Sequence, residues 1–175
     1  LGLVGAEMCI ETGSPTCGLT LAREKAAKSK ELEAKAEKKV IKAKLDGMKT
    51  RPELLKDTQT AFNAYVRYRD MGKPCISCGR PDTGEPNSRD CGHYRSVGSA
   101  PHMRFMENNA HGQCKFCNRH LAGNHVEYRK GLIERIGLRQ VEVLECFNET
   151  RKYTRDELIE LTKHYKKLTR DLKSS

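Results

Sequence analysis

Cys75-Ile76-Ser77-Cys78 and Cys114-Lys115-Phe116-Cys117 begin and end the stretch that decides the fold, with residues 79–113 between them. A C-x-x-C pair forms a tight turn that directs two sulfurs toward one point. Two such pairs supply the four thiolates of a tetrahedral zinc site. A closed shell of this kind leaves no position for substrate, so the predicted zinc is structural. The alternative, a redox dithiol, requires only one pair.

Residues suited to phosphodiester hydrolysis lie around these pairs. His93 is the predicted general base, because an unperturbed imidazole titrates near neutrality, and Asn109 is expected to orient its ring. Asp90 with Asn118 or His120 is the predicted ligand set of a catalytic cation, Mg²⁺ or Mn²⁺, since hard cations prefer oxygen ligands. The alternative for a lone histidine here is a surface residue or a neighbour of the zinc.

The charge of the chain favours a polyanionic partner. The 175 residues include 33 Lys and Arg against 23 Asp and Glu, a formal net charge of +10. Such an excess is typical of nucleic-acid-binding proteins, although a basic protein without this partner is the alternative. The predicted DNA contacts are the basic residues that flank the motif, namely Arg89, Arg95, Arg104, Lys115 and Arg119.

The composition also limits the compartment. No apolar run approaches the roughly 20 residues that a membrane-spanning helix needs, so no membrane partner is expected. Cysteines in C-x-x-C pairs favour metal ligation in a reducing cytoplasm over disulfides in a secreted protein.

Changes in composition divide the chain into four predicted parts. Cys9 and Cys17 are too few to complete a zinc site alone, and the segment that carries them is expected to be irregular. The next segment is rich in Lys, Glu and Ala, which favour helix; it either follows a phosphate backbone or is a solvated linker. The parts are an irregular segment at 1–19, a charged helix at 20–49, a core with its leading helix at 50–137, and a C-terminal helical region at 138–175.

Local signals predict several element boundaries. Thr50-Arg51-Pro52-Glu53 is typical of a helix start, and the apolar spacing that follows predicts a helix to about Met71. Thr154-Arg155-Asp156-Glu157 predicts the start of the last helix. Short strands are expected at 90–97 and 103–106. Cys146 is predicted to be a small buried hydrophobe.

The order Cys-x-x-Cys, His, Asn, Cys-x-x-Cys, Asn/His resembles the HNH nucleases, whose fold is the ββα-metal unit. Several strings resemble more closely the phage recombination endonuclease family of lambda NinG, also called Rap; phage endonuclease VII looks like a more distant relative. These strings are Cys75-Ile76-Ser77-Cys78-Gly79, Gly92-His93-Tyr94-Arg95, Arg104-Phe105, His111-Gly112-Gln113-Cys114, Cys117-Asn118-Arg119-His120 and Gly123-Asn124.

The resemblance implies a zinc-stapled α+β fold with an HNH core and flanking helices. It implies a structure-specific endonuclease that cuts D-loops and Holliday junctions in the cytoplasm of the bacterial host, beside a recombinase system. The HNH roles carry over as base to His93, support to Asn109, and cation ligand to Asn118 or His120. Cutting both strands of a symmetric junction favours a homodimer.

Two positions depart from the family pattern. Many HNH enzymes carry Asp or His immediately before the base, where this chain has Gly92, so Asp90 is expected to substitute. Gly13 stands where a cysteine of an N-terminal zinc ribbon is expected, so that ribbon is truncated or degenerate. Two other functions remain as alternative hypotheses. The chain could be a non-catalytic zinc module that binds nucleic acid, or a scaffold that loads a recombinase through its charged helix.

Overall fold

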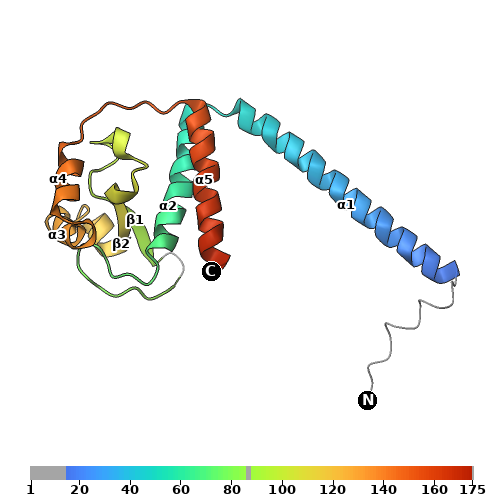
Figure 1. Ribbon diagram of the computed structural model, residues 1–175, viewed down its shortest axis with the longest axis horizontal. Coiled ribbons are helices and arrows are strands. Elements are labelled where there is room, and N and C mark those ends of the chain that lie inside the picture. Colours follow the sequence, from blue (N-terminus) through green and yellow to red (C-terminus); the bar gives the residue numbers. More distant parts are fainter. Residues whose placement is uncertain (1–14, 86–87, 175) are drawn as a thin grey trace, which may run out of the picture. The chain divides into compact units, whose positions relative to one another are not determined.

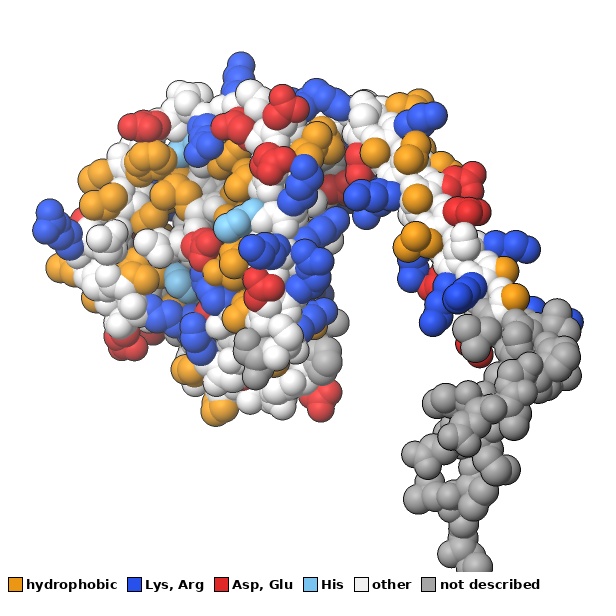
Figure 2. Space-filling model, turned by 45° about the vertical axis from the view of Figure 1, so that its right-hand side comes forward, with side chains coloured by type: hydrophobic (Ala, Val, Ile, Leu, Met, Phe, Trp, Pro, Cys, Tyr) orange, Lys and Arg blue, Asp and Glu red, His pale blue; other side chains and the backbone are white. Residues whose placement is uncertain are grey.

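The computed structural model describes residues 15–85 and 88–174, which belong to two units, residues 1–49 and 50–175 (Figure 1). The described part of the first unit is one helix, α1 (Pro15–Met48). It begins before the predicted residue 20 and includes the backbone of Cys17, whereas Cys9 lies outside the described residues. Charged and hydrophobic side chains alternate along it in Figure 2. Apolar side chains such as Leu32 and Ile41 are exposed, as expected of a solvated helix.

Two helices far apart in sequence, α2 (Arg51–Arg69) and α5 (Arg155–Ser174), lie side by side in the second unit (Figure 1). Phe62 and Leu158 are fully buried between them. The Tyr165 ring packs edge-on against the Phe62 ring, with 4.9 Å between the ring centroids. Both helices begin where the sequence predicts. The Glu53 carboxylate accepts a hydrogen bond from the Thr50 amide (2.7 Å), and the later predicted cap forms in the same way.

A two-stranded antiparallel sheet packs against α2. It consists of β1 (Arg89–His93) and β2 (Ala110–Cys114), with His93 opposite Ala110. The predicted strand at 103–106 is wrong. Residues there form η1 (Pro101–Met103) and a turn that leads into η2 (Glu107–Asn109). Local bonds such as Met106 N–H to Met103 O (3.1 Å) satisfy this backbone in place of a strand ladder.

A second core lies on the other side of the sheet, under α3 (His125–Ile136) and α4 (Leu138–Cys146). Tyr128 and Leu132 of α3 are fully buried there. Gly131 faces the Ile76 carbonyl so closely that a Cβ would overlap it, which seats α3 on the first C-x-x-C turn. Cys146 is exposed, contrary to prediction, because the inward face of α4 is formed by Val141 and Leu144.

The fold is therefore α+β, mostly helical, with one small sheet between two helical layers. None of the helices among the described residues has the length and apolar character that crossing a bilayer requires.

Candidate metal centre and active site

The four predicted zinc ligands come together. The Sγ atoms of Cys75, Cys78, Cys114 and Cys117 all lie within 4.8 Å of one another, and those of Cys78 and Cys114 are 3.8 Å apart. Zinc–sulfur bonds of about 2.3 Å in a tetrahedron place sulfurs about 3.8 Å apart. The four thiols therefore fit a metal ion such as zinc, and they fill all four positions of its shell.

Three elements present these thiols. The first pair lies in the turn after α2. Gly79 closes this turn with a φ of +67°, and its backbone amide donates a hydrogen bond to the Cys75 carbonyl (3.0 Å). Cys114 is the last residue of β2, and Cys117 lies in η3 (Phe116–His120), a short π-helix. The Cys114 amide also donates to the Cys75 sulfur at 3.3 Å. A bound metal would therefore tie the end of the sheet and η3 to the end of α2.

His93 ends β1 on the side that faces α2. Its ring lies 5.9 Å from that of Phe62, and its Nε2 lies 3.0 Å from the Arg104 carbonyl oxygen. A carbonyl only accepts, so Nε2 carries the proton and Nδ1 of the neutral ring is unprotonated. Burial lowers the pKa of His93 below its usual 6.5. At neutral pH the imidazole is therefore uncharged and able to accept a proton.

Asn109 bonds to the chain around His93 and not to its ring. The fully buried Asn109 carboxamide donates to the Arg95 carbonyl (3.0 Å) and the Met103 carbonyl (3.3 Å), and it accepts from the Arg95 amide (2.8 Å). These bonds close the loop between β1 and β2. Any orienting effect on His93 is consequently indirect, through the backbone that supplies its Arg104 partner.

The proposed cation ligands lie on the other side of β1. The Asp90 carboxylate accepts from Arg119 Nε (2.7 Å) and Nη2 (2.8 Å) and from Asn118 Nδ2 (3.1 Å). Although burial works to raise it, these bonds lower the pKa of Asp90. His120 is exposed and stacks on Phe116 at 5.8 Å between ring centroids. The structure therefore joins Asp90 to Asn118 but brings neither of them together with His93.

Packing explains why position 92 is a glycine. A Cβ at this position would overlap the Gln113 carboxamide oxygen and lie 2.9 Å from the Gln113 Cβ. Gln113 is fully buried, and its Nε2 donates to Ser77 Oγ (2.7 Å) and to the Gly123 carbonyl (2.6 Å). Gln113 thus occupies the space that a side chain at position 92 would need.

The five predicted DNA contacts divide into two groups. Arg89 is 5% exposed and donates to the Arg80 carbonyl (2.6 Å). Arg95 donates to the Phe147 carbonyl (2.6 Å) and to Asn148 Oδ1 (2.9 Å), after the end of α4. Both guanidinium groups are thus engaged inside the protein. The remaining three reach solvent in part or in full: Arg104, Lys115 and Arg119.

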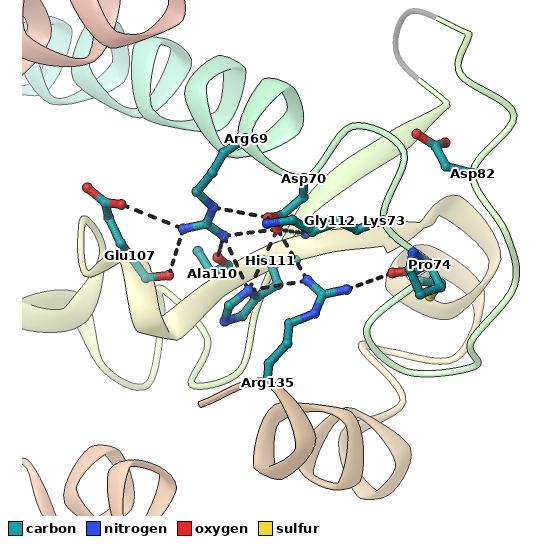
Figure 3. Close-up of polar contacts among 12 residues, drawn as sticks. Arg69, Asp70, Lys73, Pro74, Asp82, Glu107, Ala110, His111, Gly112 and Arg135 are labelled. Carbon is teal, nitrogen blue, oxygen red and sulfur yellow. Dashed lines mark hydrogen bonds and ion pairs between the residues drawn. The ribbon is translucent and has the colours of Figure 1, made fainter. Parts of the chain in front are cut away.

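Sequence reasoning missed the buried network around Asp70 (Figure 3). This carboxylate, 2% exposed, accepts from Arg69 (2.9 Å), Lys73 (3.1 Å) and the Gly112 amide (2.8 Å). Arg135 of α3 lies 3.4 Å away and also donates to the Pro74 carbonyl (2.7 Å). The network therefore joins α2, β2 and α3 at the base of the metal centre.

His111 belongs to this network and not to the predicted catalytic group. Its Nδ1 lies 3.2 Å from Arg69 Nη2 and 3.6 Å from the Asp70 carboxylate. Burial lowers the pKa of His111 even though Asp70 opposes the shift. No local motif marks these residues, because Asp70 and Arg135 are 65 positions apart.

Comparison with known proteins gives one consistent result. A family profile described as "Bacteriophage Lambda NinG protein" matches residues 5–175. Protein ninG of Salmonella phage P22 is 39% identical over 173 residues, covering 93% of this chain and 84% of that protein. Protein ninG of Escherichia phage lambda is 38% identical, covering 93% and 83%. No solved structure is significantly similar to the chain.

Proposed function

The chain belongs to the NinG family of bacteriophage lambda, and from this premise we propose that it is an endonuclease for branched recombination intermediates, D-loops and Holliday junctions. His93 carries the proposal. It is a neutral imidazole at the end of β1, and its Nε2–H bond to the Arg104 carbonyl fixes the tautomer. Hydrolysis of a phosphodiester needs such a group to take a proton from the attacking water.

His93 Nδ1 is the atom proposed to accept that proton. Its Nε2–H bond to the Arg104 carbonyl holds the ring, and the imidazolium formed keeps that bond because both nitrogens then donate. Asn109 supports the arrangement by fixing the Arg95 backbone. Zinc held by the four cysteines would stabilise the end of β2 and would take no part in the reaction.

The proposal includes a second, divalent cation, Mg²⁺ or Mn²⁺, which would stabilise negative charge on the phosphate. Its predicted ligands do not form a complete set in this structure. The Asp90 carboxylate is paired with Arg119, on the face of β1 opposite His93. Cleavage measured with and without each metal decides whether the reaction requires this cation.

DNA is proposed to approach the exposed residues Lys115 and Arg119 and the partly exposed Arg104. Each phosphate contact releases counterions and steepens the salt dependence of binding. A homodimer would place two such sites on the two strands of a symmetric junction, and the host cytoplasm is the compartment in which a phage recombination enzyme would act.

A cleavage assay tests the proposal. The zinc-loaded full chain is mixed with a four-way junction, a D-loop and a linear duplex of matched sequence, with Mg²⁺, with Mn²⁺ or with neither. We expect metal-dependent cutting of the branched substrates and a loss of about 10²- to 10⁴-fold in His93→Ala. His164→Ala, an exposed histidine on α5, is the matched control. A His93→Ala protein that retains zinc and cuts at the parental rate contradicts the assignment.

The second candidate is a non-catalytic zinc-stapled protein that binds recombination DNA. The pairing of Asp90 with Arg119 and Asn118 favours it, because it gives these residues a structural role. Tight junction binding without cutting in either metal would establish this candidate in place of the first.

A further inference from the structure

An aromatic side chain projects from the metal centre without being buried. Phe116 is one of the two residues inside the second C-x-x-C turn, and 52% of its surface is exposed. His120 stacks on it with an interplanar angle of 29°. Leu121, 45% exposed, follows, and its amide bonds to the Phe116 carbonyl (3.1 Å). Phe116 and His120 thus form a small exposed aromatic surface on η3, with an exposed leucine next in the chain.

This surface is held rigidly. The Cys117 amide donates to the Cys114 sulfur within its turn (3.4 Å), and a metal at the four thiols would fix that turn further. Asp90 fixes η3 to β1 through its bonds to Asn118 and Arg119. A ring carried by a pre-ordered turn loses little conformational entropy when a ligand covers it, so Phe116 is suited to binding.

Its immediate neighbours are basic. Lys115 precedes Phe116 and is exposed, and the Arg119 side chain is 60% exposed. Exposed aromatic rings between cations are the pattern by which proteins bind unpaired bases, because every base has a flat face and a phosphate beside it. Bases within a duplex are already stacked on one another and are not available to such a ring.

We propose that Phe116, backed by His120, is a stacking platform for an unpaired base at the branch point of DNA, a proposal that rests on the proposed function. Lys115 and Arg119 bind the adjacent phosphates. The platform selects branched over linear DNA by the base it covers, and the selection is independent of base identity because stacking is sequence-tolerant.

The test uses the zinc-loaded full chain without added Mg²⁺, so that binding is measured without cutting. The probes are a forked DNA with 2-aminopurine at the unpaired position beside the branch and a duplex of the same sequence. We expect Phe116→Ala to weaken fork binding by about 5- to 100-fold and duplex binding less than about twofold. The parental protein should quench the fluorescence of the 2-aminopurine, and Phe116→Ala should not.

Three further variants make the result specific. Phe116→Leu keeps an apolar side chain without a flat ring and should behave like Phe116→Ala, whereas Phe116→Tyr should bind as the parent does. Val143→Ala removes an apolar side chain of similar exposure (53%) from α4 and should change nothing. Zinc content checks that each variant is folded.

Several outcomes would overturn the inference. Equal weakening for fork and duplex, or unchanged quenching in Phe116→Ala, would exclude base stacking. If Phe116→Ala instead lost self-association in sedimentation and bound forks normally, the surface would belong to a second copy of the chain. If parental protein cuts junctions while these variants bind normally, only this inference fails. If the parental protein binds neither the fork nor the duplex, both the proposed function and this inference fail.

Discussion

The side chains of Asp90 and His93 lie on opposite faces of β1. Asp90 bonds to Arg119 and Asn118 of η3, whereas His93 packs on Phe62 of α2. Side chains three positions apart on a strand point in opposite directions. The two residues therefore cannot be ligand and base of one compact site without a change in this strand, and their variants should give separable effects.

The pH dependence of cleavage should follow His93. Burial lowers its pKa below 6.5, and only the neutral ring accepts a proton. We expect kcat/KM to rise with pH through that lowered pKa, so that the midpoint of the rise lies below pH 6.5. The unfolded chain takes up this proton at a higher pH than the folded chain, so stability should fall as pH decreases below about 6.5. A rising limb centred above pH 7 would contradict this assignment.

Loss of one metal ligand should unfold the centre. We expect Cys114→Ser to lose stoichiometric zinc and to lower Tm by more than about 10 °C, because the metal would join the turn after α2, the end of β2 and η3. Cys146→Ser is the control, since that thiol is exposed at the end of α4. Zinc analysis and thermal unfolding by circular dichroism measure both. Full zinc binding by Cys114→Ser would refute the four-cysteine site.

Gly92 should tolerate no side chain while Gln113 is present. Gly92→Ala forces a Cβ into the Gln113 carboxamide, which should cost about 1–3 kcal/mol of unfolding free energy. Gln113→Ala in the same chain should recover part of this loss, giving a coupling of about 0.5–3 kcal/mol. Gly98→Ala is the control, because the nearest atom to its Cβ is Ser96 Oγ at 4.0 Å. Urea unfolding of the parent, the two single variants and the double variant measures this coupling. Additive losses of unfolding free energy in the double variant would show that the contact is unimportant.

Asp70 should be among the most sensitive positions for stability. Asp70→Ala leaves Arg69 and Arg135 partly buried without their carboxylate, at a cost of about 3–5 kcal/mol. Glu160→Ala, which breaks an exposed pair on α5, should have a small effect. Equal urea midpoints for the two variants would show that the network contributes little.

Acid should remove the contribution of Asp70. Although burial opposes its ionisation, the imidazole of His111 and the guanidinium of Arg69 hold the pKa of Asp70 well below its usual 3.8. A depressed carboxyl pKa stabilises the fold above the unfolded value, and that stability is lost as pH falls further. The parental protein should therefore lose stability below about pH 4 more steeply than Asp70→Ala, as measured by urea unfolding at each pH.

Substitution of Arg95 should affect stability, whereas substitution of Lys115 should affect DNA binding. Arg95→Ala removes bonds to the Phe147 carbonyl and Asn148 after α4, so it should cost about 2 kcal/mol of stability and leave the salt dependence of DNA binding unchanged. Lys115→Ala should leave stability unchanged and reduce the slope of log Kd against log salt by about one. Fluorescence anisotropy over a salt series measures the slopes, and identical slopes for the two variants would remove Lys115 from the DNA contacts.

Local sequence determined much of the framework. The two C-x-x-C pairs identified the four clustered thiols, because each pair forms its own tight turn. The caps at Thr50 and Thr154 marked two helix starts, since a capping bond spans only three residues. The strand at 103–106 was predicted wrongly, because apolar residues in a short run fit either a strand or a 3-10 turn.

The sequence by itself determined which four thiols cluster and where the capped helices begin, because these depend on spacings of a few residues, and its resemblance to a known family indicated the α+β class. Only the tertiary structure decided that Asp90 and His93 face apart, that Asn109 bonds to Arg95, and that Asp70 joins α2 to β2 and α3. Those relationships depend on strand register and on packing between segments distant in the chain, and no local pattern of residues encodes them.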